Sequence, residues 1–277
     1  MNLSKHPLVS VIVTTRNNQA TLNACLRSIT EQTYKLVELI TIDNQSTDET
    51  KTIARTYTPH VFDRGPERSA QRNYAVAKAK GQYVLIIDSD MELEAKVVAQ
   101  CVEAVQLNPD TQAAIIPEES FGQGFWAQCK RLERSFYVGV DSIEAARFFD
   151  KKLFEQAGGY NESQTGAEDW DLTNRIAALT SIARIPEYIF HNEGRIRLRT
   201  ALKKRFYYNK GFLQYYRSSP THQKPAASVL NYYKLYLSRP AKLFRNPIQG
   251  MGMLFMKTCE FGTGALSMLA AKREDAR

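Results

Sequence analysis

Two closely spaced aspartates follow an apolar segment of the chain and could bind a metal ion. The segment, residues 83–87, reads YVLII and predicts a buried strand, and Asp88, Ser89 and Asp90 follow it directly. Their side chains would then lie at the carboxyl end of a strand, where α/β proteins bind ligands. Like charges repel at this spacing, so the pair favours a cation such as Mg²⁺ or Mn²⁺, which binds one or two carboxylates together with substrate phosphates. The pattern indicates a metal-diphosphate site, and a polar turn is the alternative.

A second acidic group lies further along the chain, at the start of a predicted helix. Glu168, Asp169 and Asp171 follow a turn at Gly158 and Gly159 and precede apolar residues at helical spacing. Acidic side chains in the first turn of a helix interact favourably with the helix dipole. Helix capping alone would account for this group.

The segments that would position these acids alternate between strand and helix patterns. Pro7–Thr15 and Leu36–Ile42 predict two strands that end in polar loops, and residues 68–80 predict a helix capped by Gly81. The order of strands and helices predicts an α/β fold whose mostly parallel sheet is covered on both faces. The apolar sides of the first helix and of the helix over 68–80 are formed by Leu22, Cys25, Leu26 and Ile29 and by Ala70, Tyr74 and Ala77.

Four segments of this region resemble the family-2 glycosyltransferases of the GT-A fold. They are VSVIVTTRN from residue 9, IDNQSTDET from 42, RSAQRNYAVAKAKGQYVLIIDSDMEL from 68 and RFFDKKLFEQAGGYNESQTGAEDWDLTNRI from 147. Each segment alone is unspecific, but their order and spacing are specific, and the resemblance covers roughly residues 7–192. It implies a Rossmann-like sheet that binds a nucleotide sugar, a divalent metal ion, and transfer with inversion at the anomeric carbon.

The resemblance assigns donor binding to the ends of the first two strands and to the helix over 68–80. Asp43 would accept the imide N–H of a pyrimidine base, and Arg72, with Arg68 as a weaker candidate, would reach the base or the diphosphate. A turn role for Asp43, and an ion pair from Arg72 to Asp88 or Asp43, are the alternatives. The loop residues assigned to the donor are Thr14, Thr15, Arg16 and Asn17, and those beside Asp43 are Asn44 and Ser46.

The same resemblance divides the roles of the two closely spaced aspartates. Asp90 would bind the metal, Mn²⁺ or Mg²⁺, directly, whereas Asp88 would contact the ribose or reach the metal through water, with Ser89 beside the donor. His191 would be a third metal ligand or a diphosphate contact, because the family often has a histidine near this place. A purely structural histidine is the alternative.

For the second acidic group, the resemblance implies a general base. The family places its base at the second acid of this motif, which is Asp169, where it would remove a proton from the acceptor hydroxyl. Glu168 precedes it as a second carboxylate whose charge would act on Asp169.

Composition limits the class of protein. A chain of 277 residues with 43% hydrophobic residues can bury one good core with room for an appendage. Its four cysteines are scattered, without the spacing of a zinc site, and indicate reduced, mostly buried thiols. The first residues, MNLSKHPLVS, have no apolar region of a secretory signal.

Charged residues are distributed unevenly along the chain. Residues 184–277 contain 18 lysines and arginines against 5 acids, a net charge of +13, whereas the preceding residues contain 19 against 24, a net charge of −5. Basic residues there alternate with aromatic ones, and Lys257 and Glu260 interrupt the apolar segment 248–271. The pattern predicts a catalytic domain over 1–192, which the resemblance identifies as GT-A, and a basic, aromatic-rich helical tail over 193–277, lying at a membrane interface without spanning it. Helices packed on the catalytic domain or at a dimer interface are the alternative.

These expectations combine into an inverting, metal-dependent glycosyltransferase. It would transfer a sugar from a nucleoside diphosphate donor, a UDP-sugar, to a lipid-linked or glycan acceptor in cell-envelope glycan synthesis, in the cytoplasm at the inner face of the membrane. A soluble enzyme with a non-lipid acceptor and a non-catalytic nucleotide-binding relative are the alternatives. Nucleotidyl transfer is disfavoured because the loop from Thr14 to Gln19 has no Gly and no Lys, and nucleic-acid binding because no recognition motif is present.

Overall fold

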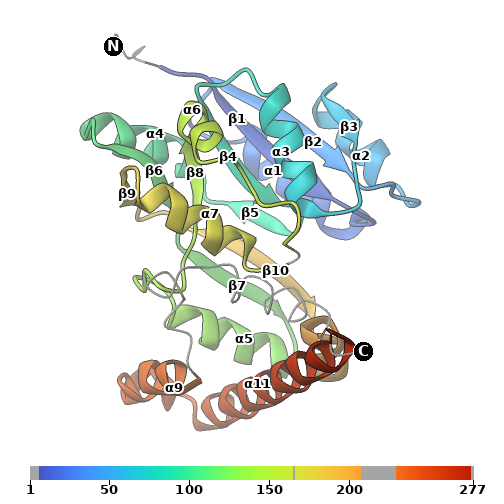
Figure 1. Ribbon diagram of the computed structural model, residues 1–277, viewed down its shortest axis with the longest axis vertical. Coiled ribbons are helices and arrows are strands. Elements are labelled where there is room, and N and C mark those ends of the chain that lie inside the picture. The colour runs from blue at the N-terminus through green and yellow to red at the C-terminus, as the bar shows by residue number, and fades with distance from the viewer. Residues whose placement is uncertain (1–5, 165, 207–228, 276–277) are drawn as a thin grey trace. The chain divides into compact units, whose positions relative to one another are not determined.

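The computed structural model describes residues 6–164, 166–206 and 229–275, and it divides into two compact units (Figure 1). Unit 1 contains the residues up to Glu118 together with Ala145–Ser163 and Glu168–Asn192. Unit 2 contains Glu119–Glu144, Gln164–Ala167 and the residues from Glu193 onward. The division at residues 192 and 193 into a catalytic domain and a tail stays a prediction.

Unit 1 begins with alternating strands and helices, as the sequence predicts. The elements in chain order are β1 (Val9–Thr15), α1 (Gln19–Thr30), β2 (Val37–Asp43), α2 (Thr50–Tyr57), β3 (Val61–Asp63), α3 (Arg68–Lys78) and β4 (Tyr83–Asp88). The short strand β3 was not predicted, because three residues are too few to establish a periodicity. Its pairing partner β2 lies some twenty residues earlier in the chain and contacts it in parallel.

The large sheet of unit 1 has seven strands in the order β3-β2-β1-β4-β8-β6-β9. The first four strands are parallel, and β8 (Ala146–Asp150) runs antiparallel to both of its neighbours. The mostly parallel α/β sheet is therefore confirmed. The antiparallel strand matters for the site, because it brings the amino end of β8 to the carboxyl end of β4.

The remaining elements of unit 1 complete the sheet and cover it. They are β5 (Met91–Leu93), α4 (Val97–Leu107), β6 (Thr111–Ile115), α6 (Lys151–Gln156), α7 (Glu168–Ala177) and β9 (Ser181–Arg184). Strand β10 (Ile189–Arg195) pairs antiparallel with β5 in a second sheet of order β5-β10-β7, where β7 is Glu118–Gln123. The helix predicted from Glu168 is confirmed, although it ends before Leu179, which is exposed.

Alternate residues of the central strands divide the core of unit 1 into two layers. Val11 and Val13 of β1 pack in the layer that contains the inner face of α1, whereas Ile12 packs on the opposite side with residues of α3 and α7. Leu22, Cys25, Leu26 and Ile29 of α1 are all buried, as their spacing predicts. A parallel sheet that is covered on both faces has this uninterrupted apolar strand pattern.

Helix α3 differs from its prediction. Ala77 is exposed and Tyr74 is half-buried, whereas Ala75 and Val76 are buried in the core. The predicted capping role of Gly81 is also wrong, because Ala79 ends the helix and Gly81 lies against β1. A Cβ atom at Gly81 would lie 2.6 Å from the Ser10 backbone nitrogen, so the close approach of the two segments explains the glycine.

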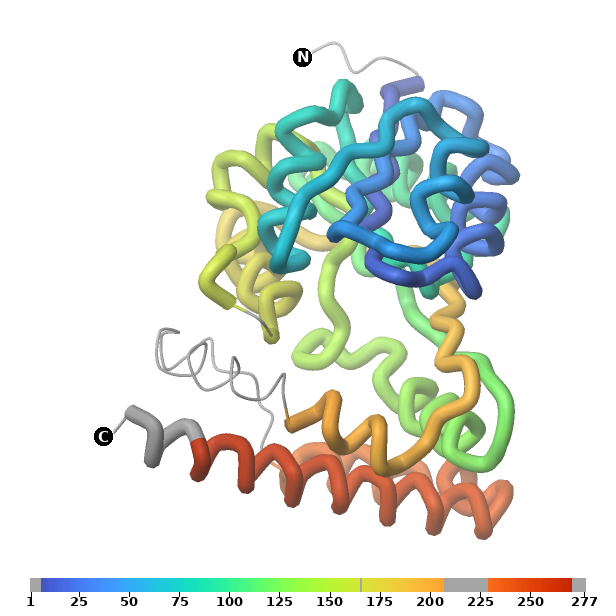
Figure 2. The backbone as a smooth tube through the Cα atoms, turned by 90° about the vertical axis from the view of Figure 1, so that its right-hand side faces the viewer, coloured from blue at the N-terminus to red at the C-terminus, as the bar shows by residue number. Residues whose placement is uncertain are grey.

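Unit 2 consists mainly of helices: α5 (Phe125–Ser135), α9 (Val229–Leu237), α10 (Pro240–Leu243) and α11 (Pro247–Asp275). Helix α11 runs without interruption and packs along α5 (Figure 2). A separate apolar core joins these helices through Phe136, Tyr236, Leu243 and Met253. Within the described residues, no helix has the length and the apolar character that crossing a membrane would require. Part of the sequence in which basic and aromatic residues alternate, residues 207–228, lies outside the described residues.

Candidate active site

Parallel pairing brings the polar ends of three strands together at one edge of the large sheet. Thr15 at the end of β1 is the register partner of Asp43 at the end of β2, and Thr14 is the partner of Asp88 at the end of β4. The Thr14 hydroxyl donates to Asp88 Oδ1 at 3.3 Å. The predicted donor-binding and metal-binding segments are therefore neighbours in space, as parallel strands require.

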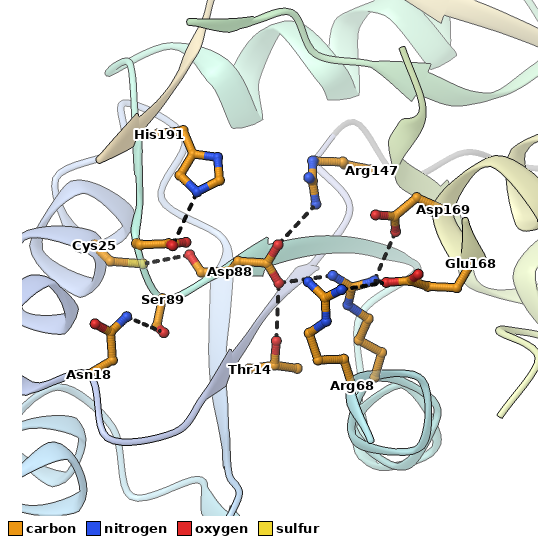
Figure 3. Close-up of polar contacts among 12 residues, drawn as sticks. Thr14, Asn18, Cys25, Arg68, Asp88, Ser89, Arg147, Glu168, Asp169 and His191 are labelled. Carbon is orange, nitrogen blue, oxygen red and sulfur yellow. Dashed lines mark hydrogen bonds and ion pairs between the residues drawn. The ribbon is translucent and has the colours of Figure 1, made fainter. Parts of the chain in front are cut away.

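Arg72 connects this edge to the acids at the start of α7. Its side chain is fully buried; Nη2 donates to Asp88 Oδ1 at 2.9 Å, and Nη1 donates to Asp169 Oδ1 at 2.8 Å. Glu168 lies 3.5 Å from the same Nη1 and 3.2 Å from Nη2 of Arg68 (Figure 3). The partner that the sequence leaves open for Arg72 is therefore Asp88 and not Asp43. One guanidinium holds two acids that are 81 positions apart in the chain.

Arg147 is a member of this group that sequence reasoning missed. It lies at the amino end of antiparallel β8, and its Nη1 is 3.9 Å from Asp88 Oδ2, while its Nε donates to Glu118 at 2.6 Å. The two phenylalanines at 148 and 149 favour a strand, but they do not indicate that this strand runs antiparallel to β4. We call the connected side chains the Arg72 network, which consists of Arg68, Arg72, Arg147, Asp88, Glu168 and Asp169.

The charges of the network shift the acidity of its members in opposite directions. Burial alone would raise the pKa of Asp88, but the charges of Arg72, Arg147 and Arg68 outweigh it and hold this pKa well below its ordinary value. Burial and the charge of Asp169 raise the pKa of Glu168. Asp88 is therefore held as a carboxylate, whereas Glu168 accepts a proton more readily than an ordinary glutamate.

Several buried polar atoms at this edge have no hydrogen-bond partner within the part of the chain that the structure describes. They are Thr15 Oγ1, Asp43 Oδ1, Arg72 Nε, Arg147 Nη1 and the Tyr160 hydroxyl, and Tyr160 lies with its ring 4.9 Å from the Arg72 guanidinium carbon. Leaving a buried polar group without a partner costs about 1–3 kcal/mol. Their concentration around one sheet edge is the pattern expected where a polar ligand supplies the missing partners.

The loops assigned to the nucleotide lie beside these atoms and are bound to one another. Asn17 has a positive φ of 46° and its backbone nitrogen donates to Ser46 Oγ at 2.8 Å, while the Ser46 nitrogen donates to Asp43 Oδ2 at 2.7 Å. Asn44 is buried and donates to the Pro66 carbonyl, and Arg16 is exposed. The turn role that the sequence leaves open for Asp43 is therefore real, and its second oxygen stays available.

Asp90 forms a pair with His191. The His191 Nε2 atom is 3.1 Å from Asp90 Oδ2, because β10 pairs with β5 and places His191 opposite Met91. Ser89, between the two aspartates, accepts a hydrogen bond from Asn18 at 2.7 Å. The strand β10 was not predicted. The resemblance pointed to His191, and the pairing of β10 with β5 explains why this residue lies close to Asp90.

The predicted metal-binding residues Asp88, Asp90 and His191 have different partners in the structure. Among the described residues, no three His, Cys, Asp or Glu side chains are arranged to hold a metal ion. The Asp88 carboxylate is paired with two arginines. The half-exposed pair of Asp90 and His191 does fit a divalent ion, which keeps several positions for water and phosphate oxygens. The prediction that Asp88, which is paired with Arg72 and Arg147, contacts the ribose or reaches the metal through water stays a prediction.

Known proteins are similar to this chain in sequence. The model of Glycosyl transferase family 2 matches residues 10–176. A GalNAc(5)-diNAcBac-PP-undecaprenol beta-1,3-glucosyltransferase from Campylobacter jejuni is 23% identical over 91% of this chain and 79% of its own length. An uncharacterised protein of Sinorhizobium fredii is 26% identical over 70% of this chain, which spans only 22% of that protein.

A solved structure has the same fold. The mannosyltransferase PcManGT from Pyrobaculum calidifontis, in complex with GDP-Man and Mn²⁺, gives a TM-score of 0.63 at 19% identity, over 95% of this chain and 87% of the other. The matched family segment covers more than half of the sequence and contains both Asp88 and Asp169. The chain is a transferase that belongs to glycosyl transferase family 2 and has the GT-A fold.

Proposed function

We propose that this protein transfers a sugar, with inversion, from a UDP-sugar to a hydroxyl group of a lipid-linked or glycan acceptor. The observation that supports this most strongly is the Arg72 network. It connects a carboxylate at the nucleotide-binding edge, Asp88, to a carboxylate on a different element, Asp169, through one buried guanidinium. Two acids bound by one cation suit a reaction in which the nucleoside diphosphate leaves the sugar on one side and the acceptor hydroxyl attacks from the other.

The donor would occupy the sheet edge. Asp43 would accept the imide N–H of uracil through Oδ1, which is buried without a partner among the described residues. Guanine also presents such an N–H, whereas cytosine and adenine present an acceptor at the equivalent place. The carboxylate would therefore favour uracil and guanine over cytosine and adenine. Arg72 Nε and Arg147 Nη1 would donate to the diphosphate, for which guanidinium groups are well suited.

A divalent ion, Mn²⁺ or Mg²⁺, would be held by Asp90 and His191. When bound, it would act as a Lewis acid that neutralises charge on the leaving nucleoside diphosphate. The protein's own arginines would share this task, because Arg72 and Arg147 already face the carboxylate of Asp88.

Asp169 would be the general base. Its side chain is 27% exposed, more than any other carboxylate of the Arg72 network, so an acceptor hydroxyl can reach it. As the hydroxyl oxygen forms a bond to the anomeric carbon, the bond from that carbon to the diphosphate oxygen breaks and the hydroxyl proton passes to Asp169. Glu168 is 5% exposed and would act through its charge on the pair of Asp169 and Arg72.

The acceptor assignment rests on the tail and on one relative. The Campylobacter jejuni relative is named for an undecaprenol-linked acceptor. The basic tail of this chain suits a phosphate-bearing lipid acceptor at the inner face of the cell membrane, where the protein would associate peripherally. A soluble, non-lipid acceptor is the second possibility, and it would leave the basic tail without a partner.

Competition among nucleotides tests the donor site. The purified full chain would be incubated with UDP, GDP, CDP and ADP in the presence of Mn²⁺ or of EDTA, and thermal stabilisation would be measured. UDP should stabilise the protein most, GDP less, and CDP and ADP least, with a smaller effect in EDTA. Equal stabilisation by CDP and UDP would contradict the role of Asp43, and no turnover with any UDP-sugar or GDP-sugar would favour a non-catalytic relative.

A further inference from the structure

The two charges that interrupt the apolar segment of α11 face the interior of unit 2. Lys257 and Glu260 are the only charged residues between positions 247 and 270, and both are buried. Lys257 Nζ lies 2.6 Å from Glu133 Oε1 of α5 and 3.0 Å from Glu260 Oε2. Lys130 Nζ is 3.0 Å from the other oxygen of Glu133. We call these four residues the Lys257 network; it neutralises its charges inside the protein.

The opposite side of α11 is apolar from Ile248 to Leu269. Its large side chains there are between 57% and 74% exposed, and they recur at intervals that place them on one side of a helix. The exposed positions between them hold threonine, glycine and alanine, so no charge interrupts the row. Twenty-two residues at 1.5 Å each give the row a length of about 33 Å. The large residues are Ile248, Met251, Phe255, Leu266 and Leu269.

The same unit carries a large excess of positive charge. Its described residues 119–144, 193–206 and 229–270 contain 14 lysines and arginines against 6 acids, a net charge of +8. Exposed cations lie directly before α11 in the chain, at Arg239 and Arg245, and Phe244 between them is also exposed. The Phe255 ring also lies 6.2 Å from the Trp126 ring of α5, between centroids, but most of its surface is exposed. An exposed apolar row of this size next to such charge needs an occupant that is apolar and negatively charged.

We propose that this side of α11, which we call the outer α11 face, binds the interfacial layer of a bilayer that contains anionic phospholipid. The helix would lie in the plane of the membrane, with its apolar side chains among the acyl chains and Arg239 and Arg245 at lipid phosphates. A second copy of the chain is a poorer partner for this face, because it would bring the same positive charge to the interface. The inference deepens the membrane association proposed above and does not depend on the transfer reaction.

Vesicle flotation tests the proposal with the full-length protein. Vesicles of phosphatidylcholine alone and of phosphatidylcholine with phosphatidylglycerol would be compared, and the wild-type protein should float with the anionic vesicles. The double variant M251S/F255S should lose at least about tenfold in bound fraction, since two exposed apolar side chains would no longer be buried. The variant L107S is the matched control, because Leu107 is 77% exposed on α4 of unit 1 and should leave flotation unchanged.

Charge is tested by the variant R239E/R245E, which should reduce binding to anionic vesicles about tenfold and leave the small binding to neutral vesicles unaltered. Circular dichroism and UDP-induced stabilisation should match the wild type in every variant, which separates failure of this proposal from failure of the proposed reaction. Wild-type protein that does not float, or M251S/F255S protein that floats like the wild type, would overturn the proposal. A dimer in sedimentation equilibrium that M251S/F255S dissociates would instead assign the face to a second copy.

Discussion

The protein contains two buried networks of ion pairs that differ in how completely their polar atoms are bonded. In the Lys257 network of unit 2, none of the buried side-chain atoms within the described residues lacks a partner, and Tyr137 adds a hydrogen bond to Glu133. In the Arg72 network of unit 1, buried nitrogens of Arg72 and Arg147 have no acceptor, and Asp88 and Asp169 are partly exposed.

The difference separates a structural network from a binding site. A closed network uses all its hydrogen-bonding capacity within the fold, so its charges mainly fix how helices pack. An open network leaves donors and acceptors that only another molecule can satisfy. Similar residue types therefore serve stability in one unit and chemistry in the other, and variants of each network should affect different measurements.

The largest effect on stability is expected from Glu133→Gln in the closed network. The substitution leaves Lys257 and Lys130 buried without their shared carboxylate, which should cost about 3–5 kcal/mol of unfolding free energy. Urea unfolding would measure it. The control is Glu119→Gln, which breaks the exposed pair with Arg131 and should cost less than about 1 kcal/mol. Equal effects of the two substitutions would mean that the Lys257 network does not stabilise unit 2.

Arg72→Gln in the open network should show the reverse pattern. The unfolding free energy should fall by only about 1–3 kcal/mol, because Asp88 and Asp169 can be solvated once the guanidinium is gone. Sugar transfer should fall by at least about 100-fold, since the donor loses a cation and Asp169 loses its anchor. Steady-state kinetics would measure the loss of transfer, and urea unfolding of the same preparation would measure the loss of stability. A variant as active as the wild type would remove Arg72 from the site.

Arg147→Gln offers a smaller and more selective test. Because its Nη1 is directed at the Asp88 side of the network, its loss should raise the KM for the nucleotide sugar roughly tenfold and change kcat less. Initial rates at varied donor concentration would show this. A fall in kcat with an unchanged KM would instead assign Arg147 to the transfer step.

Glu133 of the Lys257 network and Glu168 of the Arg72 network should contribute to stability with opposite dependence on pH. Burial alone would raise the pKa of Glu133, but Lys130 and Lys257 outweigh it and hold the pKa well below the ordinary value of 4.5, so the stability that this carboxylate contributes is present above 4.5 and is lost as the pH falls. The pKa of Glu168 is raised by burial and by Asp169, so its contribution is lost as the pH rises above the ordinary value. Unfolding between about pH 7 and about pH 3 should therefore show an acid loss that is smaller in Glu133→Gln than in the wild type. Parallel curves would contradict this.

Local patterns in the sequence predicted the framework of the site well. The strand ending at Asp88, the helix starting at Glu168 and the inner face of α1 follow from periodicity and are present as expected. What local patterns miss is pairing between distant segments. Arg147 reaches Asp88 only because β8 is antiparallel, and His191 meets Asp90 only because β10 pairs with β5.

The tail also shows what local sequence patterns fail to predict. In the sequence, Lys257 and Glu260 divide an apolar segment, whereas in the folded protein they face Glu133 and leave the other side of α11 without charge. Residues 119–144 belong to the same compact unit as the tail, which no change of composition indicates. The order of charged residues in a sequence does not show which side of a helix is charged, because that depends on how the helix packs in the folded protein.

Asp169→Asn tests the central claim most directly, when sugar transfer and donor affinity are measured on one preparation. If Asp169 is the base on the acceptor side of Arg72, transfer should fall by at least about 100-fold while the Kd for the UDP-sugar changes less than about threefold. Transfer close to the wild-type rate would contradict the account, and so would a loss of donor binding as large as the loss of transfer.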